Sequence, residues 1–397
     1  MAETQRRICV VTTSRADYGL LRRLMQEIEA DAKLELLTVV TGMHLAPEFG
    51  GTYRVVQEDA FRIHAEIEML LSSDSDVGMA KSIGVGVLSF AERLRELDPD
   101  IVVLLGDRFE LFSPAIAALM LRIPIAHIHG GETSQGAIDE AVRHSLTKMA
   151  AVHFPATEAY RRRILQMGEQ PRRVFNFGAP GLDAVHEFEP PSRFELEARL
   201  QFSLSGTVAL VTYHPVTLEP GQALGQVNEL LDAITRTGIR AIFTKANADE
   251  AGRAINDHVK RFCAQDRERF RLYDNLGTDL YFGCMSHCTL MIGNSSSGLI
   301  EAPSFALPAV NIGERQKGRI RGANVIDVAN SASEIEAGIR RACLAEFREN
   351  LSATENPYDA SKDGGASRRI KDALKEIDLS AEILMKRFND YPGGIPL

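Results

Sequence analysis

Short, continuous apolar runs alternate along the chain with segments in which apolar residues recur every third or fourth position. Runs rich in Val and Ile are typical of strands buried on both faces, and the longer periodic segments are typical of amphipathic helices. Their alternation predicts parallel strands joined by helical crossovers, in a doubly wound α/β sheet. In the first half, strands are predicted at residues 8–12, 34–41, 101–105, 125–128 and 174–177, and helices at residues 18–29, 87–96, 109–121 and 138–149.

The alternation is interrupted between residues 178 and 193, where Pro180, Pro190 and Pro191 favour a linker. It then resumes, and two such series in tandem predict two α/β domains, which suits a chain of 397 residues. Residues 366–388 are amphipathic and predicted to be helical. The second series of predicted strands is at residues 207–213, 239–244, 270–272, 289–292 and 309–312. The expected divisions are a first domain at 1–180, a linker at 181–193, a second domain at 194–370 and a tail at 371–397.

Composition excludes several classes of protein. With 45% hydrophobic and 25% charged residues, the chain is expected to be globular rather than disordered or fibrous. The net charge of -9 argues against a nucleic-acid-binding surface, which carries an excess of Lys and Arg. No signal-peptide pattern follows Met1, and no apolar stretch reaches membrane-spanning length. We therefore expect a cytoplasmic protein with no nucleic-acid and no membrane partner.

Neither a metal nor a nucleotide cofactor is expected. The five cysteines are odd in number and scattered, which does not indicate a disulfide framework. Cys284 and Cys288 lack a second pair of ligands, so buried helical thiols are the better interpretation. Gly84-Val85-Gly86 lies inside a helical segment and lacks the third glycine of a dinucleotide fingerprint, so it does not indicate an NAD site.

Polar residues that follow the predicted strands carry most of the functional signal, because ligands of doubly wound sheets bind beyond the carboxyl ends of the strands. Ser14 and Asp17 follow the first strand with the spacing of a capping box, so a helix is expected to begin there. Arg15 and the first amides of that helix could bind an anion. A well-capped helix with an exposed Arg explains the same pattern.

A turn of small residues, 293–298, follows the strand predicted at 289–292. Small residues let the backbone approach a ligand, while hydroxyls and helix amides hydrogen-bond a phosphate. Close packing of a helix against the sheet is the alternative. Glu301 lies further into the expected helix, where its carboxylate could accept both hydroxyls of a ribose. Basic residues after the next strand could offset the charge of a diphosphate; these are Arg315, Lys317, Arg319 and Arg321.

Acidic residues follow two apolar strands of the first half. Asp107, with Arg108 beside it, comes after residues 101–105, and Glu132 comes after residues 125–128. An acid in this position has no packing use, so Asp107 and Glu132 are candidates for acid–base chemistry.

The helix predicted at 138–149 opens with two further acids. Asp139 and Glu140 lie four residues before Arg143 and His144, so surface ion pairs explain them as well as catalysis does.

Three histidines lie in or after predicted strands. His214 is followed by Pro215, which ends the strand, and it is expected to face Asp107 and Glu132 across a cleft. His127 and His129 alternate along one strand, so their rings are expected on opposite faces and not in a joint metal site.

These segments together resemble the hydrolysing UDP-N-acetylglucosamine 2-epimerases of bacterial sialic acid synthesis, and the epimerase half of their bifunctional animal counterpart. The resemblance covers nearly the whole chain, with the motifs in family order. In the first half the matching segments are Ser14-Arg-Ala-Asp-Tyr-Gly-Leu20, Thr41-Gly-Met-His44, Leu105-Gly-Asp-Arg-Phe-Glu110, His129-Gly-Gly-Glu132 and Ile138-Asp-Glu-Ala-Val-Arg-His144. In the second half they are His214-Pro215, Asn247-Ala-Asp249, Gly293-Asn-Ser-Ser-Ser-Gly298, Glu301 and Asn311-Ile-Gly-Glu-Arg-Gln-Lys-Gly-Arg319.

The family has a non-hydrolysing branch, with His-Gly-Asp-Thr and Glu-Ala-Gly-Leu-Arg where this chain has residues 105–108 and 129–132, so the chain sides with the hydrolysing branch. Residues 44–49 and 68–74 look like those of members that act in legionaminic acid synthesis. The resemblance thus implies UDP-N-acetylglucosamine as donor, or alternatively UDP-2,4-diacetamido-2,4,6-trideoxyglucose (UDP-diacetylbacillosamine).

The resemblance implies a GT-B architecture, with two Rossmann-like domains, a cleft between them and a C-terminal helix returning to the first. It implies anti elimination of UDP, followed by hydration of the 2-acetamidoglycal to the free manno sugar, without metal or NAD. It also implies a homodimer or homotetramer.

Site residues follow from the motifs together with their strand-end positions. The expected acid–base residues are Asp107, Glu132 and His214, with Asp139 or Glu140 as a fourth. The residues expected to bind UDP and the sugar are Arg15, Gly19, Arg108, Asn247, Ser295, Ser296, Glu301 and Arg315. A GT-B glycosyltransferase and a non-catalytic UDP-sugar-binding protein are the alternatives, because fold alone does not determine function.

Overall fold

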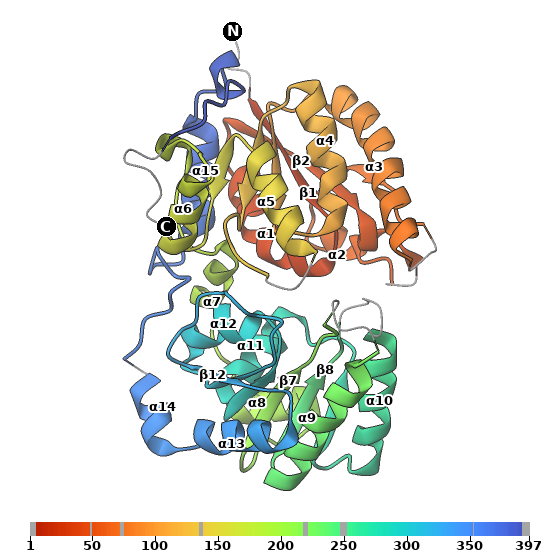
Figure 1. Cartoon of the computed structure of the whole chain (residues 1–397), viewed down its shortest axis with the longest axis vertical. Helices are drawn as coiled ribbons and strands as arrows, with labels where there is room; N and C mark the ends of the chain where they lie inside the picture. Colours follow the sequence, from red (N-terminus) through yellow and green to blue (C-terminus); the bar gives the residue numbers. More distant parts are fainter. Residues whose placement is uncertain are drawn as a thin grey trace. The chain divides into compact units, whose positions relative to one another are not determined.

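The computed structural model describes residues 5–47, 50–71, 75–134, 138–216, 221–246, 252–351 and 353–390. The chain forms two compact units (Figure 1). The first comprises Met1–Glu132, Ile138–His186 and Tyr358–Leu397, and the second comprises Thr133–Ala137 and Glu187–Pro357. The second unit therefore ends at Pro357, and residues 358–370, which the sequence analysis assigned to the second domain, belong to the first unit.

The first unit is built on a six-stranded parallel sheet in the order β3-β2-β1-β4-β5-β6. Its strands are β1 (Arg6–Thr12), β2 (Leu34–Thr41), β3 (Ile63–Ile67), β4 (Ile101–Leu105), β5 (Ile125–Ile128) and β6 (Val152–Phe154). Its helices are α1 (Arg15–Glu29), α2 (Tyr53–Glu58), α3 (Asp76–Leu97), α4 (Phe112–Leu121), α5 (Asp139–Met149), α6 (Glu158–Gln166), α7 (Asp183–His186) and α15 (Ala366–Glu376).

Helices cover both faces of this sheet (Figure 1). Because successive strand residues point to opposite faces, β1 contributes to two cores. Ile8 and Val10 are buried with α1 and α15, whereas Cys9 and Val11 are buried with α3, α4 and α5. The apolar runs of the sequence thus form strands covered on both sides, as the doubly wound prediction requires.

The second unit repeats this plan with a parallel sheet in the order β12-β11-β10-β7-β8-β9. Its strands are β7 (Val208–Thr212), β8 (Arg240–Thr244), β9 (Phe270–Tyr273), β10 (Leu290–Gly293), β11 (Ala309–Ile312) and β12 (Val325–Val328). Its helices are α8 (Arg193–Leu200), α9 (Ala223–Thr237), α10 (Gly252–Gln265), α11 (Gly277–His287), α12 (Ser297–Ile300), α13 (Ala332–Ala342) and α14 (Ala345–Leu351). Each unit is therefore a Rossmann-like domain, and the predicted GT-B-like fold class is confirmed.

Strand order reverses at one point in each sheet, between β1 and β4 in the first unit and between β7 and β10 in the second. At such switch points the two connecting helices leave on opposite faces and open a crevice at the carboxyl ends of the strands. The segments that follow these four strands carry most of the candidate residues.

The C-terminal segment returns to the first unit, as the resemblance implied. In α15, Ile370 and Leu374 are buried in the same core as α1, and Arg6 Nη1 donates to the Leu374 carbonyl at 2.6 Å. The predicted helix at 366–388 is too long, however, because α15 ends at Glu376 and the described residues after it, up to 390, hold only a short 3₁₀ turn, Ala381–Ile383.

Other differences from the predicted elements occur at the sheet edges and in the supposed linker. Residues 174–177 form no strand; one bridge links His153 to Val174, and Phe175 stacks on Phe154 with 5.9 Å between ring centroids. The supposed linker holds a 3₁₀ turn, Pro180–Leu182, and α7. Three strands, β3, β6 and β12, were not predicted; they lie at sheet edges, where strands are short and often partly polar.

Candidate active site

Arg143 is the centre of a buried charge network at the carboxyl ends of β4 and β5. Its side chain projects from α5 and is 1% exposed. The guanidinium forms an ion pair with Asp107, donates to the His129 carbonyl at 2.8 Å, and lies 3.5 Å from a carboxylate oxygen of Glu132. A buried guanidinium is stable only when anions and acceptors surround it, so Arg143 fixes the positions of all three partners. Arg143 was predicted only as half of a surface pair with Asp139, so its buried role was not foreseen from the sequence.

Glu132 also binds the imidazole of His129, whose Nδ1 lies 2.5 Å from Glu132 Oε1. His129 follows the last residue of β5 and has a φ of 61°, in the left-handed region that non-glycine residues seldom adopt. His129 therefore lies beyond the strand. The prediction that the rings of His127 and His129 lie on opposite faces of one strand was wrong, also in its premise, because residues two apart in a strand point to the same face.

His127 is a structural residue. Its ring nitrogens lie 2.8 Å from the Gly106 carbonyl and 3.1 Å from Thr147 Oγ1. Burial lowers the pKa of His127 to about 3, so the ring is neutral.

Arg108 is held by an acid that the sequence analysis left without a role. Its Nη2 lies 2.6 Å from Oε1 of Glu110, which is fully buried, while the Arg108 side chain remains 27% exposed. A single Glu within an apolar segment, Phe109–Leu111, was the available signal for this partner.

Asp139 and Glu140 lie half-buried in the first turn of α5. Glu140 Oε1 is 3.2 Å from His144 Nε2, so the predicted pair between these two residues is present.

The loop after β1 forms the predicted capping box. Asp17 accepts hydrogen bonds from the backbone amides of Thr13 and Ser14, both at 2.7 Å. These two amides are therefore committed to Asp17, and among the candidates here only Arg15 offers a free charge to an anion. Arg15 and Gly19 are both exposed on α1.

In the second unit, His214 and Asn294 join the two strands of the switch point. The His214 amide donates to Asn294 Oδ1 at 2.7 Å, and Asn294 Nδ2 donates to the His214 carbonyl at 2.8 Å. Burial, and then the nearby charge of Arg315, lowers the pKa of His214 to about 3. The ring is consequently a neutral imidazole at physiological pH.

The turn after β10 combines close packing with a polar surface. A side chain at Gly293 would overlap the Thr212 backbone, so glycine is required where β7 and β10 approach each other. Ser295 and Ser296 are half-buried beside it. The following helix, α12, has only four residues, so Glu301 is its C-cap rather than an internal residue.

The basic residues after β11 differ in how far they are neutralised. Arg315 Nη1 donates to the Asn294 carbonyl at 3.0 Å, which holds it beside the turn. Lys317 pairs with Glu314 at 2.6 Å, and Arg321 pairs with Asp327 at 2.6 Å.

Arg319 donates to the Thr133 carbonyl at 3.1 Å. Arg315 is therefore the basic residue of this group that lies closest to the β7–β10 switch point. Asn247 lies outside the residues that the structure describes.

Within the described part of the chain, no three His, Cys, Asp or Glu side chains are grouped so that they could hold a metal ion. Cys284 and Cys288 are free buried thiols. None of the helices in the described ranges is long and apolar enough to cross a membrane.

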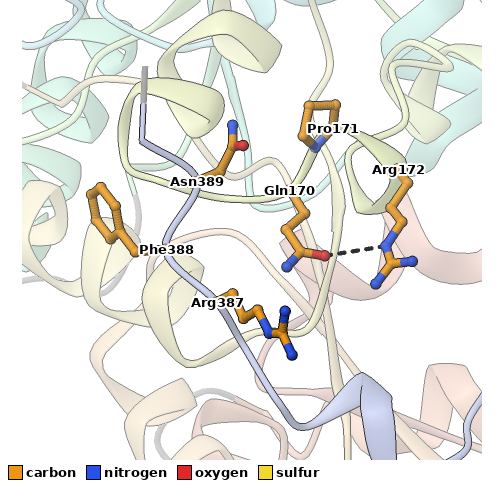
Figure 2. A pocket seen from close by; sticks show the side chains of 6 residues that line it. All are labelled: Gln170, Pro171, Arg172, Arg387, Phe388 and Asn389. Atoms are coloured by element: carbon orange, nitrogen blue, oxygen red, sulfur yellow. Dashed lines mark hydrogen bonds between the residues drawn. The ribbon is translucent and has the colours of Figure 1, made fainter. Parts of the chain in front are cut away.

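A surface pocket of the first unit is lined by residues outside the strand-end segments described above (Figure 2). It is formed where the C-terminal segment passes the 3₁₀ turn Pro171–Arg173, and Gln170 Oε1 accepts from Arg172 Nε there at 3.1 Å. It contains none of the candidate acids or histidines. Its lining residues are Gln170, Pro171, Arg172, Arg387, Phe388 and Asn389.

Comparison with known proteins identifies relatives over nearly the full length. Residues 26–375 match the family model for UDP-N-acetylglucosamine 2-epimerase. The GDP/UDP-N,N'-diacetylbacillosamine 2-epimerase (hydrolyzing) of Campylobacter jejuni is 39% identical, covering 98% of this chain and 100% of the relative. The UDP-N,N'-diacetylbacillosamine 2-epimerase (hydrolyzing) of Legionella pneumophila is 37% identical, covering 96% and 98%. The crystal structure of UDP-GlcNAc 2-epimerase from Neisseria meningitidis bound to UDP-GlcNAc superposes with a TM-score of 0.80 at 18% identity, covering 94% and 100%, which shows a shared fold.

Proposed function

Because the chain belongs to the UDP-N-acetylglucosamine 2-epimerase family, we propose that it is a hydrolysing 2-epimerase of a UDP-linked 2-acetamido sugar. The observation that carries the proposal is the Arg143 network. It holds Asp107, Glu132 and the His129 backbone together at the carboxyl ends of two neighbouring strands, where a doubly wound sheet binds its ligand.

The preferred donor in this proposal is UDP-2,4-diacetamido-2,4,6-trideoxyglucose, with UDP-N-acetylglucosamine as the alternative. The two relatives at 39% and 37% identity bear the name of the diacetamido sugar, whereas the Neisseria meningitidis UDP-N-acetylglucosamine 2-epimerase is 29% identical. The segments 44–49 and 68–74 favoured the same donor, although residues 48, 49 and 72–74 lie outside the described structure.

The proposed reaction has two steps. In the first, a base takes the hydrogen of carbon 2 as a proton, the electron pair of that bond forms the double bond between carbons 1 and 2, and the bond from carbon 1 to oxygen breaks with its pair on UDP. In the second, the oxygen of water bonds to carbon 1 and gives up one proton to a base, while the electron pair of the double bond takes a proton at the opposite face of carbon 2. The products are UDP and a free manno sugar.

We assign the acid–base chemistry to Asp107, Glu132 and His214, with Asp139 or Glu140 as a fourth group. Such groups each contribute about two to four orders of magnitude to a rate when correctly placed. The low pKa of His214 supports a role as a neutral base or hydrogen-bond partner rather than as a cation. Arg108, which Glu110 holds, would bind the sugar.

UDP is assigned to the second unit. Arg315 beside the turn, with Ser295 and Ser296 in it, would stabilise the charge that develops on the leaving diphosphate. Glu301 would accept the ribose hydroxyls. Arg15, Gly19 and Asn247 complete the proposed substrate contacts. We further expect a cytoplasmic homodimer or homotetramer.

The test is UDP release, with NMR of the sugar product, for UDP-N-acetylglucosamine and the diacetamido donor offered separately in EDTA. The GDP-linked diacetamido donor belongs in the same series, since the Campylobacter jejuni relative is named for both nucleotides. The proposal expects UDP and a free manno sugar, fastest with the UDP-linked diacetamido donor.

A UDP-linked epimer as the product would contradict the hydrolytic step. Donor binding without turnover would favour a binding protein, and turnover only with an added sugar acceptor would favour a glycosyltransferase.

A further inference from the structure

His129 is a buried histidine of the first unit, and one of its ring nitrogens has no hydrogen-bond partner within the described residues. Its side chain is 6% exposed, and Nδ1 lies against Glu132. Nε2 has no hydrogen-bond partner among the residues that the structure describes. By contrast, both ring nitrogens of His127 are bound, as are those of His44, to Thr12 at 3.0 Å and Thr52 at 2.9 Å. A buried polar atom without a partner is costly unless a ligand satisfies it.

The backbone of His129 is held in a left-handed conformation directly after the end of β5. Its φ of 61° is maintained from both sides, because its amide donates to the Phe154 carbonyl at 3.0 Å and its carbonyl accepts from Arg143 at 2.8 Å. Strained backbone of this kind persists where surrounding structure enforces it and is concentrated at functional sites.

Glu132 determines which ring nitrogen carries the proton. An ionised carboxylate can only accept hydrogen bonds, so the 2.5 Å contact makes Nδ1 the donor. In a neutral imidazole the lone pair then lies on Nε2, which is the atom without a partner. A carboxylate that orients an imidazole in this way makes the opposite nitrogen a proton acceptor.

His153 provides the matched structural case. It is also buried in a pair with a glutamate, Glu169, at 3.1 Å, and its Nδ1 likewise has no partner within the described ranges. However, His153 lies inside β6, away from the switch point, and Lys148 and Lys386 neutralise its glutamate at 2.5 and 2.8 Å. Position at the end of β5, next to Asp107 and Arg143, is what distinguishes His129.

We propose that His129 Nε2 is the base that takes the proton of carbon 2, and that Glu132 is a positioning residue that acts through His129. This inference rests on the proposed 2-epimerase function. The proton of carbon 2 bonds to Nε2, the electron pair of the broken bond forms the double bond to carbon 1, and UDP leaves with the pair of the carbon 1–oxygen bond. The imidazolium then returns its proton to solvent. Glu132 then orients the His129 ring and does not itself exchange a proton with the sugar.

The test combines a double-mutant cycle with chemical rescue. His129→Asn and His129→Gly suit the left-handed backbone, and Glu132→Gln keeps the shape of the acid. We expect His129→Asn to slow UDP release about 10²- to 10⁴-fold. The Kd for UDP should stay within about twofold, because the proposed UDP site lies in the other unit.

Two readouts separate a proton acceptor from a merely structural residue. Glu132→Gln should slow release in the wild type but have almost no further effect in His129→Asn, because a residue that acts through His129 has nothing left to position. Added imidazole should restore release at least about tenfold in His129→Gly, where the missing ring leaves a cavity. The control His153→Gln should neither lose the activity of the folded protein nor respond to imidazole.

Several results would overturn the assignment. Additive effects of the two substitutions would mean that Glu132 acts by itself, and absence of imidazole rescue in a variant that still binds UDP would make His129 structural. Normal UDP release with accumulation of the 2-acetamidoglycal would assign His129 to the second step. If the wild-type protein turns over none of the donors, both the proposed function and this inference are wrong. If the wild type is active but the effects of the His129 and Glu132 substitutions are additive, only the inference is wrong.

Discussion

The two units share a strand order but differ in the chemistry at the point where that order reverses. In the first unit the carboxyl end of β4 at the switch point, with that of β5 beside it, is densely charged, because Asp107 and Glu132 are gathered around the buried guanidinium of Arg143. In the second unit it is nearly uncharged, and His214 and Asn294 are joined by two reciprocal neutral hydrogen bonds. The same backbone plan therefore supports two different tasks.

The difference is consistent with the two needs of the proposed reaction. Proton transfer at a weakly acidic carbon requires groups with fixed protonation and position, which a charge network provides. A leaving diphosphate requires donors and one well-placed cation beside a closely packed backbone, which the β7–β10 turn and Arg315 provide. Substitutions in the charged network of the first unit should thus affect chemistry, whereas those at the β7–β10 turn should affect nucleotide binding, stability and the position of His214.

Asp107→Asn should have the largest effect. The ion pair with Arg143 would lose its charge, and an acid–base group would be lost with it. We expect UDP release to fall about 10³-fold while UDP binding is retained. Asp98→Asn, at an exposed helix end where Asn suits the φ of 41°, is the control and should be fully active. If Asp107→Asn retains activity within about tenfold of the wild type, the charged network around Arg143 does not supply the main acid–base groups.

Asn294→Ala, in the second unit, should have the second-largest effect. The amide and carbonyl of His214 would lose their partners inside the protein. The free energy of unfolding should fall by about 1–3 kcal/mol, measured by circular dichroism in urea. UDP release should slow at least about tenfold because His214 is displaced. Asn228→Ala, a more exposed residue that binds His258, should change stability by less than about 0.5 kcal/mol. Equal stability of the two variants would refute the bracing role of Asn294.

Glu301→Gln should act on nucleotide binding. If the carboxylate accepts the ribose hydroxyls, loss of its charge should raise the Kd for UDP about tenfold, since hydrogen bonds to charged groups are worth about 1.5–3 kcal/mol. Isothermal titration calorimetry with UDP measures the change. Glu314→Gln, which affects an exposed pair with Lys317, should leave the Kd unaltered. An unchanged Kd in Glu301→Gln would remove Glu301 from the proposed UDP site.

The pH dependence of stability should be similar in the two units despite their different chemistry. Burial lowers the pKa of both His127 and His214 from 6.5 to about 3. Between these values the unfolded chain binds more protons than the folded one, so the free energy of unfolding rises with pH and levels off above 6.5. Each histidine should contribute about 1 kcal/mol per pH unit within that window.

Urea unfolding at pH 5.5 and 7.5 tests this prediction. His127→Gln should reduce the change of the unfolding free energy with pH in the first unit, and His214→Gln should reduce it in the second. A slope that neither substitution changes would show that other groups govern acid stability.

The sequence predicted the fold and the location of the site better than the site's internal geometry. Apolar strands and their trailing residues, such as Asp107 after β4, could be recognised because strand ends converge in a parallel sheet. Edge strands such as β3 were missed because their half-polar sequences resemble loops. The end of α15 was misplaced because residues 377–388 are amphipathic without being helical.

Pairings within the site depend on tertiary contacts that spacing does not encode. Arg143 and Asp139 have the spacing of a surface pair, yet Arg143 is buried and binds Asp107 from another element. The left-handed backbone of His129 has no sequence signal beyond the two glycines that follow it. Glu110 could have been suspected as a partner for Arg108 only because it is a charged residue in an apolar segment.

The most direct test of a hydrolysing 2-epimerase is the reaction of UDP-2,4-diacetamido-2,4,6-trideoxyglucose in D₂O, followed by proton NMR of the sugar. Elimination and rehydration predict a free manno sugar that carries deuterium at carbon 2, together with one equivalent of UDP. A free sugar that retains its original hydrogen and gluco configuration at carbon 2 would contradict the account, because the enzyme would then be a simple hydrolase that never breaks the carbon–hydrogen bond.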